Sequence, residues 1–150
     1  AGGPKDIIKA IAKIQSQSTT NPSSISQAAA VEALNGKQDF ISIRSKAFQE
    51  RRDFVVNSLN SIDGINCLNP QGAFYVFPNC KKLIGKKDKA GKKIENDTDF
   101  VQSLLENYGI AVVQGSAFGL EGFFRVSYAT SMENLEKAMN KIKEFCESLN

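Results

Sequence analysis

The sequence predicts an α+β domain: a small sheet of about three or four strands with helices packed on one face, preceded by helices of another domain. Three observations predict this fold class. Long segments repeat apolar residues at helical spacing, and short aromatic and β-branched runs lie between turns that contain glycine or proline. From about residue 45 these two kinds of segment alternate. A chain of 150 residues is also long enough to bury a hydrophobic core.

The first part of the chain contains two expected helices and no expected strand. Isoleucines recur at helical spacing, which predicts a helix at about 4–16. After a polar break, Ser23 or Ser24 can cap a second helix that an Asn-Gly pair ends. Because this part has no sheet of its own, we expect residues 1–44 to be the edge of a different domain and residues 45–150 to form the domain with the sheet.

The remaining elements follow from hydrophobic spacing and from cap and turn residues. A long helix is expected at about 39–61, with one apolar side and one strongly charged side. The final helix is expected to open with Thr130 and Glu133, which have the spacing of a capping box. Between these helices lie expected strands near 65–68 and 73–77, a helix from Asp97 or Thr98 to about Asn107, and strands at 109–115 and 122–129.

Much of the positive charge lies in one lysine-rich segment. The chain has 19 basic and 16 acidic residues, and residues 81–93 hold seven lysines and one aspartate, which leaves 12 basic and 15 acidic residues elsewhere. A local run of this kind is usually a solvated loop, so we expect no nucleic-acid partner. No apolar run approaches the roughly 20 residues that a membrane-spanning helix needs, so we expect no membrane partner.

The composition excludes several kinds of active site. The chain has no histidine, which removes histidine-based triads, histidine general bases and most zinc sites. Its three cysteines, Cys67, Cys80 and Cys146, are odd in number and lack metal-ligand spacing. We therefore expect no metal site and no disulfide framework, and a reducing, cytoplasmic location fits best.

One expected strand carries an arginine in the middle of an apolar run. In "GFFRVSYA" (122–129) alternate side chains point to opposite faces, which predicts a packing face made of Phe124, Val126 and Tyr128. Arg125 then lies on the other face, beside Phe123. A solvated surface arginine is one interpretation. The other is a guanidinium that binds a carboxylate through two parallel hydrogen bonds, on a face that something else covers.

Two further segments have a structural and a functional interpretation. The segment "GAFYVF" (72–77) is most often part of a sheet core, although its glycine could let the backbone approach a ligand closely. The segment "GSAFG" (115–119) has no partner histidine for a nucleophile elbow, so a loop at the end of a strand is the better interpretation.

Four motifs, in order, resemble a known family. They are "AGGPKDIIKAIAKIQSQSTTNPSSISQAAAVEAL" (1–34), "PQGAFYVF" (70–77), "GIAVVQGSAFG" (109–119) and "FFRVSYATSMENLEKAMNKI" (123–142). Together they resemble the C-terminal part of the aspartate aminotransferases, class I pyridoxal-phosphate-dependent aminotransferases of the prokaryotic branch. The resemblance runs from residue 1 to about residue 148. Because the chain also starts without methionine, we expect it to be a C-terminal fragment.

The resemblance implies a fold in which a large domain binds pyridoxal 5'-phosphate and a small C-terminal domain closes over the substrate. It implies a homodimeric enzyme that transfers an amino group from L-aspartate to 2-oxoglutarate. Matched residue by residue, Arg125 falls on the arginine that binds the α-carboxylate of the amino-acid substrate. Residues 1–44 would then be the end of the large domain and the interdomain connection, and residues 17–22 would lie near the partner subunit's active site, with no role assigned.

The resemblance also implies what this chain lacks. The family's Schiff-base lysine, its phosphate-binding arginine and the aspartate that pairs with the pyridine nitrogen all fall before residue 1. We therefore expect no catalytic and no cofactor-binding residue here, and an inactive isolated chain. The substrate stays open between aspartate and aromatic or prephenate-type compounds. A second hypothesis is a free-standing α+β domain that binds an acidic ligand or partner without chemistry.

Overall fold

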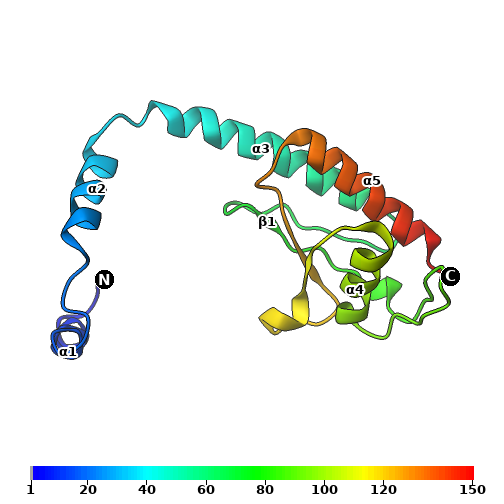
Figure 1. Cartoon of the computed structure of the whole chain (residues 1–150), viewed down its shortest axis with the longest axis horizontal. Helices are drawn as coiled ribbons and strands as arrows, with labels where there is room; N and C mark the ends of the chain where they lie inside the picture. Colours follow the sequence, from blue (N-terminus) through cyan, green and yellow to red (C-terminus); the bar gives the residue numbers. More distant parts are fainter. Residues whose placement is uncertain (1) are drawn as a thin grey trace. The chain divides into compact units, whose positions relative to one another are not determined.

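The computed structural model describes residues 2–150, which separate into two compact units (Figure 1). One unit ends at Ile41, and the other spans Ser42–Asn150. None of the helices in the described part of the chain is long and apolar enough to cross a membrane.

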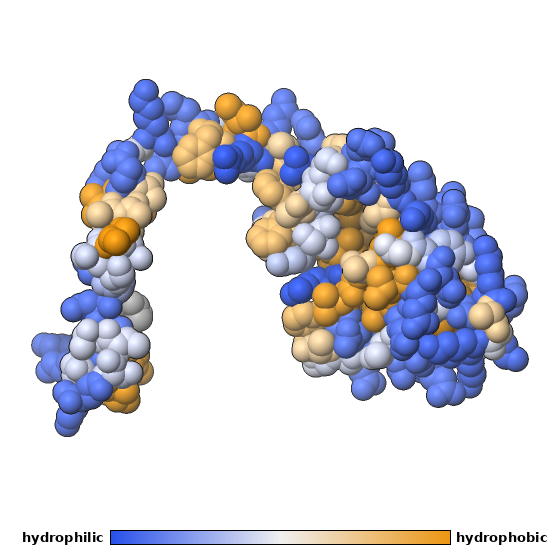
Figure 2. All heavy atoms as spheres, in the orientation of Figure 1, coloured by the Kyte–Doolittle hydropathy of each residue, from blue (hydrophilic) through white to orange (hydrophobic). Residues whose placement is uncertain are grey.

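The first unit contains helices α1 (Lys5–Gln15) and α2 (Ser24–Asn35), so the two predicted helices are confirmed. Ser23 is the N-cap residue of α2, although its side chain accepts no capping hydrogen bond. None of residues 2–41 is buried within this chain. Apolar atoms are therefore exposed on this unit, as Figure 2 shows. The large exposed apolar side chains of its two helices are Ile7, Ile11, Ile14, Ile25, Val31 and Leu34.

The sheet has three short antiparallel strands in the order β1-β3-β2. These strands are β1 (Tyr75–Val76), β2 (Val113–Gln114) and β3 (Phe124–Ser127). In the central strand β3, Ser127 pairs with Tyr75 on one side and Arg125 pairs with Val113 on the other. The expected α+β fold with a small sheet is confirmed.

The expected strand near 65–68 is wrong. Only an isolated bridge forms there, between Asn66 and Asn79. The physical reason is Asn60, the last residue of helix α3 (Asp39–Asn60), because its side chain forms hydrogen bonds with the backbone of Cys67. The Asn60 side-chain oxygen accepts a hydrogen bond from the Cys67 N–H at 2.8 Å, and the Asn60 amide donates to the Cys67 carbonyl at 2.9 Å. Those groups are no longer available to a neighbouring strand.

Two predicted helix caps are also wrong by one residue. Helix α4 (Asp97–Tyr108) is capped by Asn96, whose side chain accepts from the Asp99 N–H at 2.9 Å. Helix α5 (Met132–Ser148) is capped by Ser131, which accepts from the Asn134 N–H at 3.2 Å, so the predicted Thr130–Glu133 capping box does not form. In both places adjacent residues have competent side chains, and the local sequence does not decide between them.

The core of the second unit joins one face of the sheet to α3, α4 and α5 (Figure 1). The Phe100 ring of α4 lies 5.1 Å from Phe124 of β3 and 5.1 Å from Phe145 of α5, measured between ring centroids. Leu59 of α3 completes this contact region, and all four side chains have no exposed surface. The packing face predicted for β3 is therefore confirmed.

The lysine-rich segment is exposed, as predicted, but its backbone is held in place. It includes a short 3₁₀ helix, η1 (Lys81–Leu83), and a buried carboxylate, Asp88. The Asp88 carboxylate accepts hydrogen bonds from the Ser103 hydroxyl at 2.6 Å and from the N–H of Lys92 at 2.9 Å. The Ser103 hydrogen bond is the main cause that lowers the pKa of Asp88, so the carboxylate stays charged and keeps the loop attached to α4.

Candidate functional site

The candidate site begins with the alternation of side chains in β3. Phe124 and Val126 are buried in the core, whereas Arg125 is half-buried and Ser127 is exposed on the other face. Because the core fixes the orientation of the strand, the arginine is directed away from the core. We call the face that carries Arg125 the arginine face.

The Arg125 guanidinium lies against two aromatic rings from the neighbouring strands. Its Cζ atom is 4.4 Å from the ring centroid of Tyr75 in β1 and 4.5 Å from the ring centroid of Phe118. Phe118 belongs to the 3₁₀ helix η2 (Gly115–Phe118), which directly follows β2. Among residues 2–150, the guanidinium donates no hydrogen bond and forms no ion pair. Its N–H groups are therefore free to bind an anion.

Further aromatic side chains continue the arginine face next to this pair of rings. The Phe77 ring stacks on Phe123 at 5.6 Å between centroids and meets Phe118 edge to face at 6.0 Å. The Lys81 ammonium lies 5.3 Å from the Phe123 centroid. The sequence suggested that something covers Phe123, and Phe77 and Lys81 of the same unit do so in part. Phe123 is therefore half-buried.

The turn that carries Phe118 is held by a buried carboxylate and by a close backbone approach. Asp97 is 1% exposed, and its carboxylate accepts a hydrogen bond from the Ser116 N–H at 2.7 Å. A Cβ atom at Gly115 would lie 2.8 Å from the Phe123 carbonyl oxygen, so only glycine fits this contact without displacement. Asp97 was predicted as a helix cap, and it instead positions the η2 turn.

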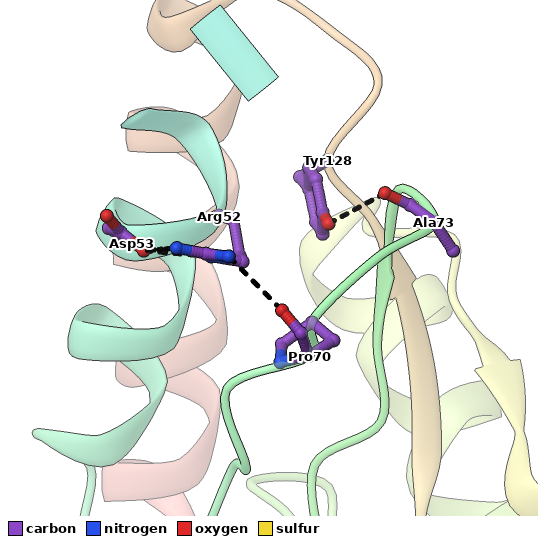
Figure 3. A network of polar contacts seen from close by, with 5 residues as sticks. All are labelled: Arg52, Asp53, Pro70, Ala73 and Tyr128. Carbon is purple, nitrogen blue, oxygen red and sulfur yellow. Dashed lines mark hydrogen bonds and ion pairs between the residues drawn. The ribbon is translucent and has the colours of Figure 1, made fainter. Parts of the chain in front are cut away.

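A second polar network connects the loop before β1 to helix α3 and to the end of β3 (Figure 3). The Tyr128 hydroxyl donates to the Ala73 carbonyl at 3.0 Å, and Arg52 donates to the Pro70 carbonyl at 3.3 Å and pairs with Asp53 at 2.7 Å. Arg52 and Tyr128 help to line a hollow of about 310 Å³. Burial raises the pKa of the Tyr128 phenol, while Arg52 opposes the change, so the hydroxyl stays a donor at neutral pH.

The sequence singled out Arg125 as a candidate but did not point to the residues that surround it. Tyr75 was read as part of a plain sheet core, and Phe118 as part of a loop. Tyr75 opens β1 and Phe118 directly follows β2, and the strand order that brings both rings beside Arg125 is not visible in the sequence. Tyr128 was expected only to pack, and its hydroxyl had no visible partner in the sequence.

The described residues favour binding over covalent chemistry. Burial raises the pKa of the thiol to about 11 for Cys67 and to about 12 for Cys80 and Cys146, so these cysteines are not nucleophilic thiolates at neutral pH. No group of cysteine and carboxylate side chains within residues 2–150 could hold a metal ion. The arrangement can hold an anion at Arg125.

Comparison with known proteins places the chain in a family. The family model described as "Aminotransferase class I and II" matches residues 1–142. The chain is 56% identical over 149 residues to the aspartate aminotransferase of Rhizobium meliloti (strain 1021), and 58% identical over 146 residues to the probable aspartate/prephenate aminotransferase of Rhizobium leguminosarum bv. phaseoli. These matches cover 99% and 97% of this chain, and 36% of each relative.

A solved structure agrees with this assignment. The crystal structure of the aspartate aminotransferase from Rhizobium meliloti superposes with a TM-score of 0.92 at 56% identity. The match covers 100% of this chain and 38% of that chain. The chain thus spans little more than a third of the length of the relatives it matches.

Proposed function

Because this chain belongs to the class I and II aminotransferases, we propose that it is the C-terminal part of an aspartate aminotransferase. The longer protein would transfer an amino group from L-aspartate to 2-oxoglutarate by means of pyridoxal 5'-phosphate. This part would supply the substrate-binding Arg125 and the domain that closes over the substrate. The observation that carries the proposal is a half-buried guanidinium, free of protein partners among residues 2–150, on a strand fixed by the core.

Arg125 is suited to an α-carboxylate for two reasons. A guanidinium and a carboxylate are both planar and can form two parallel charge-assisted hydrogen bonds, which fix orientation as well as distance. The central strand that carries Arg125 is paired on both sides, so its position is set by the fold before the substrate arrives. Correct placement of the substrate is a large part of catalysis, because it replaces a bimolecular encounter with an oriented complex.

The residues of this chain do not fit the cofactor on their own. The Schiff-base lysine of such an enzyme must be desolvated or otherwise activated to act as an amine nucleophile. Every lysine within residues 2–150 is exposed except Lys86, which is half-buried and donates to the Leu149 carbonyl. We therefore assign the cofactor to the longer protein, and derive no step of the reaction through it here.

This assignment predicts that the purified chain of residues 1–150 has no transaminase activity. Incubation with pyridoxal 5'-phosphate, borohydride reduction and intact mass measurement should give no stoichiometric adduct. A single stoichiometric adduct on one lysine would show that a cofactor site exists within these residues. The same would follow from measurable transfer between aspartate and 2-oxoglutarate by this chain alone.

The proposal includes the organisation of the longer protein. Residues 1–44 would be the end of the large domain and the interdomain connection, and residues 45–150 the small domain. The exposed isoleucines of α1 support this division, because an apolar stripe on a folded unit normally packs against something. We further propose that the longer protein is a homodimer. We also propose that it is cytoplasmic, in keeping with three unpaired cysteines. The mass of the longer protein in solution tests the dimer.

The test of the Arg125 assignment is an Arg125→Lys variant of the longer protein. Lysine keeps the charge but cannot form the two parallel hydrogen bonds. We expect kcat/KM for L-aspartate to fall by roughly 30- to 1,000-fold, which corresponds to about 2–4 kcal/mol of transition-state stabilisation. Arg51→Lys is the matched control, since Arg51 lies against the Phe48 ring on α3 and not on the arginine face. An unchanged kcat/KM in Arg125→Lys would refute the assignment.

The choice of substrate is tested with the same protein. The names of the two relatives differ on this point, since one refers to aspartate and the other to aspartate and prephenate. We propose aspartate as an amino donor for the longer protein. Comparing kcat/KM for L-aspartate with that for an aromatic amino acid tests this, and a preference for the aromatic donor would contradict it.

A further inference from the structure

We propose that Tyr75 and Phe118 are positioning residues for Arg125, which hold its guanidinium between two rings while leaving its N–H groups free for a carboxylate. The proposal rests on the binding role given to Arg125 above and adds two residues to that site. These rings lie 4.4 Å and 4.5 Å from the guanidinium carbon, measured to the ring centroids.

The two rings approach from opposite sides because of the strand order. Tyr75 belongs to β1 and Phe118 directly follows β2, and both strands pair with the central strand that carries the arginine. The face of an aromatic ring attracts a cation through its quadrupole. It does so without a carboxylate or carbonyl acceptor, so the five N–H donors of the guanidinium remain available.

Each ring is itself held in place. The Phe118 ring packs edge to face on Phe77, and its turn is tied to α4 by the hydrogen bond from Ser116 to Asp97. The Tyr75 ring packs on Phe74 at 4.3 Å between centroids, and the Tyr128 N–H donates to the Phe74 carbonyl at 2.9 Å. The rings can therefore restrict the arginine instead of moving with it.

Restricting the arginine has a clear physical benefit for binding. A free arginine side chain has many rotamers, and ordering them when a ligand binds weakens the affinity. Two flanking rings remove much of that freedom before the ligand arrives. The expected result is tighter binding of a carboxylate than the hydrogen bonds of a freely moving arginine would give.

The first test measures binding directly in the cofactor-loaded longer protein. Maleate, a dicarboxylate that does not react, is titrated by calorimetry. Phe118→Leu and Tyr75→Leu keep apolar bulk but remove the ring face, and each should raise the Kd of maleate by about three- to tenfold. Tyr75→Phe, which keeps the ring, should have a Kd for maleate within about twofold of the parent value. An unchanged Kd in both leucine variants would overturn the proposal.

The second test asks whether the rings act through the arginine. The same leucine substitutions are made together with Arg125→Gln, and kcat/KM for L-aspartate is compared in a double-mutant cycle. If the rings position Arg125, their substitution should change kcat/KM by less than about twofold once the guanidinium is gone. An equal loss in both backgrounds would mean that the rings contact the substrate or support the fold directly, which would overturn the positioning role.

Two controls separate this proposal from its alternatives. Tyr108→Leu removes a ring that lies outside the arginine face and against a different cation, the Lys89 ammonium at 5.5 Å from the ring centroid, so the Kd of maleate should stay unchanged. If Arg125→Gln alone leaves kcat/KM unchanged, the binding role of Arg125 fails. If Arg125→Gln lowers kcat/KM but the ring variants do not, only the positioning role fails.

Discussion

The two faces of the three-stranded sheet differ in what their side chains contact. On the core face, Phe124 and Val126 pack among buried side chains of α3, α4 and α5. On the arginine face, Arg125 lies between partly exposed rings and has no hydrogen-bonded partner within residues 2–150. Adjacent residues of one strand can therefore serve stability and binding separately. The buried face makes the strand rigid, and that rigidity would position Arg125 for the carboxylate binding that we propose.

The largest effect should come from the core face. Phe124→Ala removes a ring that is fully buried and lies against Phe100, and it leaves a cavity that the neighbouring helices can fill only in part. We expect the chain to lose about 3–5 kcal/mol of its free energy of unfolding. Urea denaturation followed by circular dichroism measures this loss. A loss below about 1 kcal/mol would mean that the face is not packed as described.

Alkaline pH should lower the free energy of unfolding through two buried core thiols, without any substitution. Burial raises the pKa of Cys80 and Cys146 to about 12, whereas their pKa in the unfolded chain is near the ordinary value of 9.0. Folding stability from these thiols is complete below pH 9.0 and is lost as pH rises toward 12, because only the unfolded chain releases the protons over this window. At about pH 10 we expect a loss of roughly 1 kcal/mol for each thiol.

The control for the alkaline effect is a variant without one of the thiols. Cys146→Ala should have a shallower fall of unfolding free energy between pH 9 and pH 11 than the unchanged chain, although its stability at pH 7 is lower. The two curves are measured by urea denaturation at each pH. Parallel curves would show that Cys146 is not the group responsible.

A further effect on stability should come from Gly115, which lies where β2 meets the turn that carries Phe118. Gly115→Ala places a Cβ atom 2.8 Å from both the Cβ atom and the carbonyl oxygen of Phe123, so the turn must shift. We expect a loss of about 1–3 kcal/mol in the free energy of unfolding. The longer protein should also bind maleate more weakly, because Phe118 moves with its turn. Unchanged stability and affinity would contradict the close approach.

Gly119→Ala is a useful comparison for this prediction. Gly119 has a positive φ of 75°, but a Cβ atom there would meet nothing within 4 Å. Its substitution tests backbone strain alone, with an expected cost of about 1 kcal/mol. The difference between the two variants then reports the steric contact at Gly115.

Local patterns predicted much of this fold, and long-range contacts decided the rest. The period of the apolar residues was enough to place α1, α3 and α5 and to orient the strand around Arg125. It failed at residues 65–68, where the Asn60 side chain accepts a hydrogen bond from the Cys67 N–H and donates one to the Cys67 carbonyl, and no strand forms. Asn60 lies only seven residues before Cys67, but the spacing of apolar residues does not show that its side chain binds this backbone.

The candidate site was predictable only at its central residue. Arg125 stands out because it interrupts an apolar strand and because the family resemblance points to it. Tyr75 and Phe118 could not be assigned, since each lies far from Arg125 or across a turn, and only the strand order brings them together. The same holds for Asp88, whose partner Ser103 lies 15 residues away on α4. The sequence alone does not show which distant segments contact one another.

The smallest effect on stability should come from Arg125 itself. This prediction tests the difference between the core face and the arginine face most directly. Arg125→Gln removes the contacts with two rings, each worth about 0.5 kcal/mol at an exposed site, and it also removes a charge that has no carboxylate partner within residues 2–150. We expect the free energy of unfolding to change by less than about 1 kcal/mol, measured by urea denaturation. A loss as large as that of Phe124→Ala would make Arg125 a structural residue. A small loss, together with a large loss of affinity for maleate in the longer protein, would mean that the arginine face is kept for binding.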